Sequence, residues 1–366
     1  MIKILIVDDS PLMRRLLDGI FQATGEFEVA LARNGVEALR QLHEFKPDVI
    51  TLDVRMPEMD GLACLDRIML ERPCPVIMVS SLTAAGAAET LESIGLGAVD
   101  FVAKPGRAIS LEIDALAPIL IEKARAASKA RLRRSHRLTE RVRARIGEHL
   151  RQPPSLPIVP VPSIVEPPTG LAGDLAGCLL VGTSTGGPPA LDALLSPLPE
   201  NFPWPVVVIQ HMPASFTGPL AQRLNGLCAL DVLEVVRPTP LVAGRVYVAR
   251  GDSDLIVSRR PAGLIVQPVP SSAEFHWHPS VDRLVDSAID HIGARRLVGV
   301  LMTGMGDDGA AAMTRVRNQG GRTIAEAEET AVIWGMPGSL VRAGGAEFVV
   351  PLEEIADRVI ALARHP

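Results

Sequence analysis

The chain has 366 residues, which is long for one compact hydrophobic core and fits two domains. Apolar residues make up 47% of it and charged residues 22%, as in ordinary globular proteins, and the net charge of −5 excludes a strongly basic nucleic-acid binder. The four cysteines lack CxxC spacing, and neither a signal peptide nor a membrane-spanning run is visible, so we expect a cytoplasmic protein with reduced thiols and no membrane insertion.

Residues 1–122 alternate short apolar runs with helical stretches. Runs rich in Val, Ile and Leu are typical of strands buried on both faces of a parallel sheet. The pattern therefore predicts five βα units with helices on both sides of the sheet. The predicted strands are Ile4–Val7, Val29–Ala32, Val49–Leu52, Val76–Val79 and Phe101–Ala103.

Polar residues follow or end four of these five strands. Asp8 and Asp9 lie at the end of the first, Asp53 of the third, Ser80 of the fourth and Lys104 of the fifth. The carboxyl ends of parallel strands share one edge, where sites are built. Carboxylates gathered there suit Mg²⁺, which would help one of them accept a phosphoryl group. Each acid alone could be a helix cap, but their joint placement favours a site.

The stretches "ILIVDDS", "LDVRMPEMDG", "MVSS" and "DFVAKP" resemble the response-regulator receiver domain. The resemblance implies a flavodoxin-like fold in which Asp53 accepts a phosphoryl group from a sensor histidine kinase. The implied Mg²⁺ ligands are Asp8, Asp9, Asp53 and the Arg55 carbonyl. The implied reporters of the phosphorylated state are Ser80, Phe101 and Lys104.

Residues 123–173 read as a linker between two domains. The first part, 123–150, is basic and free of Pro, which predicts a helix. The second part, 151–169, holds seven Pro and predicts an extended, semi-rigid segment. The basic stretch could bind nucleic acid or an acidic membrane, but it has no interleaved aromatic residues. A solvated helix that docks an acidic partner is the favoured interpretation.

Residues 174–366 predict a second, doubly wound and mostly parallel α/β domain. Helical patterns fall between several of its strands, and the segments "RGDSD" and "RRPAG" indicate an antiparallel hairpin insertion. The predicted strands are Leu179–Val181, Val206–Ile209, Val232–Val236, Val246–Ala249, Leu255–Val257, Leu264–Val266, Val298–Met302, Thr323–Ala325 and Phe348–Val350.

The stretch "VGTSTGGPPAL" (181–191) raises the question of what Ser184 does. A phosphate cradle would need other Gly and Lys spacings. A nucleophile needs a base and an acid, and His211 and either Asp307 or Asp308 also follow apolar strands. Amides of the Gly-rich turns could bind an oxyanion. A turn or cap serine is the plain alternative, but three such residues at strand ends favour catalysis.

"VGTSTGGPPAL", "IQHMPASFT" and "LMTGMGDDGAAAM" resemble the catalytic domain of the chemotaxis methylesterase response regulators, the CheB family. The resemblance implies a phosphorylation-activated hydrolase that demethylates γ-methyl glutamates on methylated chemoreceptors and deamidates glutamines there, with no cofactor for the ester chemistry. It carries over Ser184 as nucleophile, His211 as base and Asp308 as the orienting acid. The Met305 amide would help bind the oxyanion, with Thr185 lining the site.

One position departs from the family pattern, because Thr183 stands where the family usually has Ala. "HWH" (276–278) is a poor metal site, since two His at this spacing lack a third ligand nearby. A surface or substrate-facing segment is the favoured interpretation, and Trp277 is expected to line the entrance to the active site.

Two rival functions remain open at this stage. One is a non-enzymatic adaptor switched by phosphorylation, and the other is a regulator that acts on nucleic acid through the basic linker. We expect no nucleic-acid partner. We expect the unphosphorylated receiver to pack over the strand ends of the catalytic domain.

Overall fold

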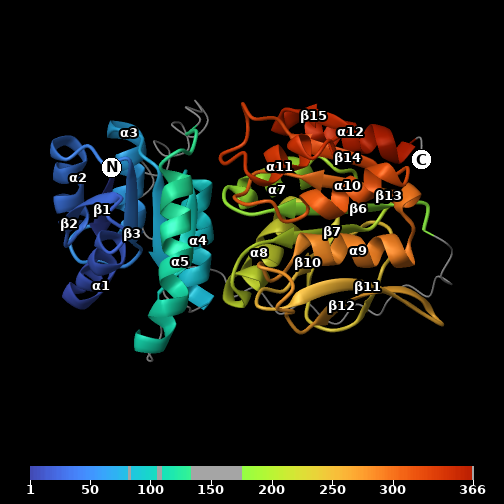
Figure 1. The fold of residues 1–366 in the computed structure, drawn as a ribbon, viewed down its shortest axis with the longest axis horizontal. Coiled ribbons are helices and arrows are strands. Elements are labelled where there is room, and N and C mark those ends of the chain that lie inside the picture. The colour runs from blue at the N-terminus through green and yellow to red at the C-terminus, as the bar shows by residue number, and fades with distance from the viewer. Residues whose placement is uncertain (81–83, 105–108, 133–174, 365–366) are drawn as a thin grey trace.

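The computed structural model describes residues 1–80, 84–104, 109–132 and 175–364, which form two α/β bodies lying side by side (Figure 1). The N-terminal body contains a five-stranded parallel sheet in the order β2-β1-β3-β4-β5. Its strands are β1 (Ile2–Val7), β2 (Phe27–Ala32), β3 (Val49–Asp53), β4 (Val76–Ser80) and β5 (Asp100–Ala103). Its helices are α1 (Pro11–Gln22), α2 (Gly35–Glu44), α3 (Gly61–Glu71), α4 (Ala84–Gly95) and α5 (Ile109–Ala127).

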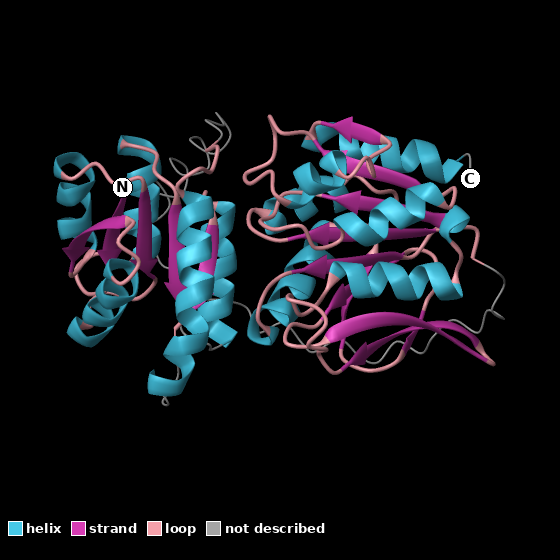
Figure 2. Cartoon of the chain, viewed as in Figure 1, coloured by secondary structure: helices cyan, strands magenta, loops and turns pink. Residues whose placement is uncertain are grey.

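Both faces of this sheet are covered by helices (Figure 2). In β1, Leu5 and Val7 belong to the core shared with α2, α3 and α4, whereas Ile4 and Ile6 belong to the core shared with α1 and α5. Alternate residues of a strand point to opposite faces, so burial of both faces requires an unbroken apolar run. The predicted receiver fold is confirmed.

The C-terminal body contains a seven-stranded parallel sheet in the order β15-β14-β13-β6-β7-β10-β8. Its strands are β6 (Cys178–Thr183), β7 (Val206–Gln210), β8 (Asp231–Val235), β10 (Arg245–Ala249), β13 (Leu297–Leu301), β14 (Arg322–Glu326) and β15 (Phe348–Val350). Its helices are α7 (Gly187–Leu195), α8 (Ala214–Leu227), α9 (Val281–His291), α10 (Ala310–Asn318), α11 (Met336–Arg342) and α12 (Leu352–Arg364), with a short 3₁₀ turn at Ala294–Arg296.

The predicted hairpin exists, but it forms part of a separate sheet. Strands β11 (Asp254–Arg260) and β12 (Gly263–Val269) pair antiparallel around the "RRPAG" turn, and β9 (Thr239–Pro240) pairs with β12. Strand β10, before "RGDSD", stays in the parallel sheet between β7 and β8. The two-residue strand β9 was not predicted, because it contains a Pro and carries no alternating pattern.

The basic helix predicted over 123–150 is described only at its start. Helix α5 ends at Ala127, and residues 128–132 continue without helix. Residues 133–174, which hold the rest of that prediction and the Pro-rich segment, lie outside the described residues. None of the described helices combines the length and the apolar character needed to cross a membrane.

The two bodies meet through α4, β5 and the segment after α5. Helix α4 packs against α7 and α8, on the side of the N-terminal body that faces its neighbour (Figure 1). The rings of Phe101 in β5 and Phe216 in α8 lie 4.3 Å apart between centroids. Beyond α5, the Arg131 guanidinium pairs with Glu328 and the Arg131 amide donates to the Val332 carbonyl. Apolar and polar contacts therefore fix the junction together.

Candidate functional site

The first candidate site lies at the carboxyl edge of the N-terminal sheet. Asp8 follows β1 and Asp53 ends β3, and each of Asp8, Asp9 and Asp53 offers a carboxylate oxygen within 4.8 Å of the others. Asp8 and Asp53 are buried, and Asp9 is exposed. Hard oxygen donors gathered this closely suit a divalent cation. The residues present therefore fit the Mg²⁺ site predicted from the sequence.

Lys104 supplies the positive charge in this pocket. Its Nζ lies 2.8 Å from Asp8 Oδ2 and 2.7 Å from Asp53 Oδ2. Burial raises the pKa of Asp53, and the ion pair with Lys104 opposes part of that rise. Burial alone would lower the pKa of Lys104, but its hydrogen bonds to Asp53 and Asp8 outweigh this effect and raise it. Lys104 is thus held as a cation directly beside Asp53.

The other predicted receiver residues fall into two groups. Ser80 ends β4 and donates a hydrogen bond to the Gly86 carbonyl at the start of α4. The Arg55 side chain pairs with Glu89 of α4 at 3.0 Å. Both residues therefore connect the Asp53 pocket to α4. Phe101 instead lies in the junction with the second body, where its ring meets Phe216.

The second candidate site begins at the end of β6, where the strand gives way to the turn before α7. Ser184 is 6% exposed, and its amide donates to the Thr303 carbonyl at 3.0 Å. The chain then turns through Gly186, whose φ of +76° is in the left-handed region that favours glycine. The turn therefore holds the serine at the carboxyl end of a central strand.

A side-chain bridge connects this turn to the end of β7. The Thr183 hydroxyl donates to Gln210 Oε1 at 2.7 Å, and Gln210 Nε2 donates to the carbonyls of Ser184 (2.9 Å) and His211 (3.2 Å). Thr183 and Gln210 are both buried. The threonine that departs from the family pattern thus orients an amide that joins the two strand ends.

His211 follows β7 directly, and its ring pairs with a carboxylate. Its Nε2 lies 2.8 Å from Asp308 Oδ2. Because a carboxylate accepts at that nitrogen, Nε2 carries the proton in the neutral ring, and Nδ1 keeps its lone pair. Nδ1 is buried and has no hydrogen-bond partner among the described residues. His211 can therefore act as a base through Nδ1.

Asp308 sits at the N-terminus of α9, which supplies most of its hydrogen bonds. Oδ1 accepts from the Ser280 hydroxyl and the Asp282 amide, each at 3.0 Å, and Oδ2 accepts from the Val281 amide at 2.7 Å. Burial would raise the pKa of Asp308, but the bonds from His211 and these amides hold it below its ordinary value of 3.8. Asp308 is therefore an ionised partner for His211.

The structure distinguishes between the two acids that the sequence left open. Asp308 is buried against His211, whereas Asp307 is exposed. No hydrogen bond connects Ser184 Oγ to His211 in the part of the chain that the structure describes. Such bonds commonly tighten only when substrate is bound.

The Gly-rich loop after β13 lies against the turn that carries Ser184. A Cβ on Gly304 would lie 2.8 Å from Ser184 Cβ, so only glycine permits this approach. Met305 is buried, and its amide and that of Thr185 have no acceptor among the described residues. The Thr185 hydroxyl is used differently, because it donates across the junction to Asp100.

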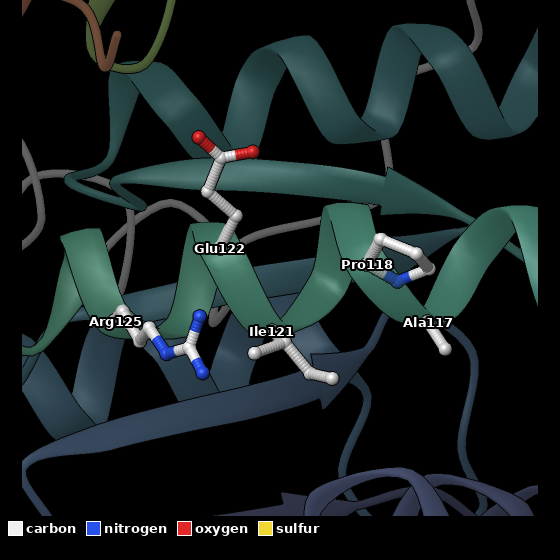
Figure 3. A pocket seen from close by; sticks show the side chains of 5 residues that line it. All are labelled: Ala117, Pro118, Ile121, Glu122 and Arg125. Carbon is white, nitrogen blue, oxygen red and sulfur yellow. The ribbon is translucent and has the colours of Figure 1, made fainter. Parts of the chain in front are cut away.

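Several residues around the site were not predicted as functional. Ser280 carries an N-cap signal in "HPSVD", and a helix N-terminus attracts anions, but the identity of the anion cannot be read from it. Gln210 gave no signal. A surface hollow along α5, lined by Ala117, Pro118, Ile121, Glu122 and Arg125, contains none of the predicted site residues (Figure 3).

Two family profiles match the chain. The profile described as CheB methylesterase covers residues 179–359, and the profile described as response regulator receiver domain covers residues 4–113. A protein-glutamate methylesterase/protein-glutamine glutaminase of Rhodopseudomonas palustris is 54% identical over 98% of both chains, and one of Rhodospirillum rubrum is 50% identical over 99% of this chain and 96% of its own. The crystal structure of the Thermotoga maritima CheB methylesterase catalytic domain is 38% identical, covers 51% of this chain and 98% of its own, and gives a TM-score of 0.49.

The first prediction concerns the Gln210 bridge. Gln210→Met keeps the shape but removes three buried hydrogen bonds, and it leaves the His211 carbonyl without its side-chain donor, so we expect the free energy of unfolding to fall by about 1–3 kcal/mol. Thr183→Val removes one hydrogen bond and should cost less. Denaturant titration of both variants measures this, and equal stability of Gln210→Met and wild type would contradict it.

The second prediction concerns Asp308. Asp308→Asn removes the charge that orients His211, so a fluorophosphonate probe should label Ser184 more slowly by a factor on the order of 10³. The depressed pKa means that the charge stabilises the fold above about pH 4 and that this contribution is lost as the pH falls through the depressed value. The stability gap to wild type should be widest at neutral pH and close in acid. Unchanged labelling would show that Asp308 does not act on the site.

Proposed function

The chain belongs to the CheB family, and from this premise we propose that Ser184, His211 and Asp308 carry out its reaction and that Asp53 controls it. Its activity is that of a protein-glutamate methylesterase/protein-glutamine glutaminase under a response-regulator receiver, and it serves adaptation in chemotaxis. Family membership thus favours the hydrolase over the non-enzymatic adaptor.

The observation that carries the residue assignment is the buried His211–Asp308 pair beside the nucleophile turn. Because Nε2 of His211 is bonded to an ionised Asp308, Nδ1 is the nitrogen available to take the Ser184 proton. The imidazolium that forms is stabilised by the same carboxylate. Four donors, including His211 itself, hold that carboxylate in place.

The proposed reaction is acyl transfer through Ser184. Its Oγ attacks the carbonyl carbon of a glutamate γ-methyl ester as His211 accepts the proton. The amides of Thr185 and Met305 are the proposed donors to the tetrahedral oxyanion. His211 returns the proton to the leaving methoxide, methanol departs, and water then cleaves the acyl-enzyme to glutamate. With glutamine as substrate, ammonia leaves in place of methanol.

We propose methylated chemoreceptors as the substrate and a sensor histidine kinase as the phosphodonor. The four cysteines are all unpaired thiols, which suits the cytoplasmic location proposed for the chain.

The receiver would hold Mg²⁺ through Asp8, Asp9, Asp53 and the Arg55 carbonyl. When bound, the cation would neutralise charge on the transferred phosphoryl group. Lys104, already beside Asp53, would then pair with the acyl phosphate, and Ser80 would bond another of its oxygens. Ser80 and Arg55 both contact α4, so a change at Asp53 can reach the helix that packs on α7 and α8. Phe101 would pass the same change to α8 through its ring contact with Phe216.

The junction supports a restraining role for the unphosphorylated receiver. The Val99 carbonyl accepts from the Gly186 amide at 3.1 Å, and Asp100 accepts from the Thr185 hydroxyl. Both partners belong to the turn that carries Ser184. We propose that phosphorylation shifts the domains towards an arrangement that releases this turn.

The third prediction tests the reaction and its control. Methanol release from methylated receptor membranes should be lost in Ser184→Ala, falling by at least about 10³-fold. In Asp53→Ala a basal rate should persist without stimulation by a small phosphodonor and Mg²⁺. Methanol release from Ser184→Ala at the wild-type rate would rule out Ser184 as the nucleophile. Stimulation of Asp53→Ala by the phosphodonor would rule out Asp53 as the phosphorylation site.

The fourth prediction tests the junction. Asp100→Ala deletes the acceptor for Thr185, and the loss of this one buried hydrogen bond across the junction should raise the basal rate roughly three- to tenfold. The phosphorylated rate should stay near that of wild type. Asp18→Ala, an acid whose partner is Gln22 within α1, is the control. An unchanged basal rate in a folded Asp100→Ala protein would contradict the restraining role.

A further inference from the structure

Trp277 lies on the loop between β12 and α9 and contacts the ring of His211. The ring centroids are 5.0 Å apart, and the planes differ by 10°, which is an offset parallel stack. Trp277 is half-buried, and no hydrogen bond of its indole is present among the described residues. The sequence predicts only that Trp277 lies at the entrance to the site, and it does not predict the contact with His211.

The loop that carries Trp277 is fixed immediately after it. The next residue, His278, bonds Asp254 Oδ1 through Nδ1 at 3.1 Å, and the Ser280 amide donates to the same oxygen at 2.9 Å. The Asp254 side chain is fully buried and also pairs with Arg283 of α9. A carboxylate with three partners therefore anchors the backbone close to the indole.

The space for the indole is provided by the loop after β13. A Cβ on Gly306 would lie 3.5 Å from Trp277 Nε1, in contact with the indole, and Gly306 has a φ of +81°. Trp277 thus spans from His211 to the residue that follows Met305. It forms a wall of the site against one face of the His211 ring.

His211 needs such a wall, because one hydrogen bond does not fix a ring. The bond from Nε2 to Asp308 restrains that nitrogen, but Nε2 lies close to the Cβ–Cγ axis, so rotation of the ring about this axis moves it little. The terminal torsion of a histidine is broad, so the side chain itself imposes little restraint. Nδ1, on the opposite part of the ring, has no partner among the described residues. The stacked indole lies nearly parallel to the ring and so opposes this rotation.

We propose that Trp277 is a positioning residue for His211, which holds the imidazole plane so that Nδ1 faces the Ser184 hydroxyl. This inference rests on the proposed function of Ser184 and His211. The loop that ends in Ser280 and Val281 then restrains His211 twice, through Asp308 at the ring edge and through Trp277 at the ring face.

The test compares Trp277→Leu, Trp277→Phe and the matched control Phe275→Leu in the full-length chain with phosphodonor and Mg²⁺. Phe275 lies on the same loop, where its ring contacts Arg283. Leu fills space but cannot stack, so we expect Trp277→Leu to lower kcat roughly 10- to 100-fold with KM unchanged. Trp277→Phe should restore most of the rate, and Phe275→Leu should match wild type.

Two further readouts keep the outcome unambiguous. An indole stacked on His211 shifts the imidazole protons upfield in the NMR spectrum of histidine-labelled protein, and Trp277→Leu should abolish that shift. Equal kcat in Trp277→Leu and wild type would overturn the proposal, as would His211 signals without an upfield shift in wild type. Fluorophosphonate labelling separates the two levels, because absence of label on Ser184 in wild type would overturn the proposed nucleophile, whereas normal wild-type labelling with no slowing in Trp277→Leu would overturn the role of Trp277 alone.

Discussion

The interaction on which the catalytic body depends is the carboxylate of Asp308 at the N-terminus of α9. A buried carboxylate is costly unless donors replace its water shell. Here two helix amides, a cap hydroxyl and the imidazole of His211 do so. The same contacts that stabilise the charge also fix α9 against the loop after β13. The same hydrogen bonds thus stabilise the fold and set the position of the His211 ring.

The turn that carries Ser184 has two sets of neighbours, and they belong to different domains. Thr303 and Gln210 hold it from the catalytic body, and Val99 and Asp100 hold it from the receiver. Asp100 also pairs with Lys123 of α5. The receiver therefore contacts the two residues that follow Ser184 in its turn, and only a short path separates the Asp53 pocket from Ser184.

Much of this arrangement could be predicted from the sequence. Strands buried on both faces leave continuous apolar runs, and residues at their carboxyl ends meet at one edge, so the positions of Asp8, Asp53, Ser184 and His211 at such edges could be predicted without coordinates. The donors to Asp308 could not be found, since they come from a helix nearly thirty residues earlier in the chain, and backbone amides leave no mark in a sequence. The stack of Trp277 on His211 and the separate sheet of β11 and β12 depend equally on tertiary packing.

The central register has a consequence for how such a site can change over time. Thr183 of β6 lies opposite Gln210 of β7, and Leu301 of β13 lies opposite Gly182 of β6. The three adjacent strands therefore end at nearly the same level of the sheet. A strand has a period of two, and one inserted residue within β7 would therefore turn His211 to the wrong face. Insertions and deletions are harmless only where they leave the register of these strands unchanged, as in the turn between β11 and β12. The register of the central strands therefore confines insertions and deletions to parts of the domain that do not set the positions of the residues at these strand ends.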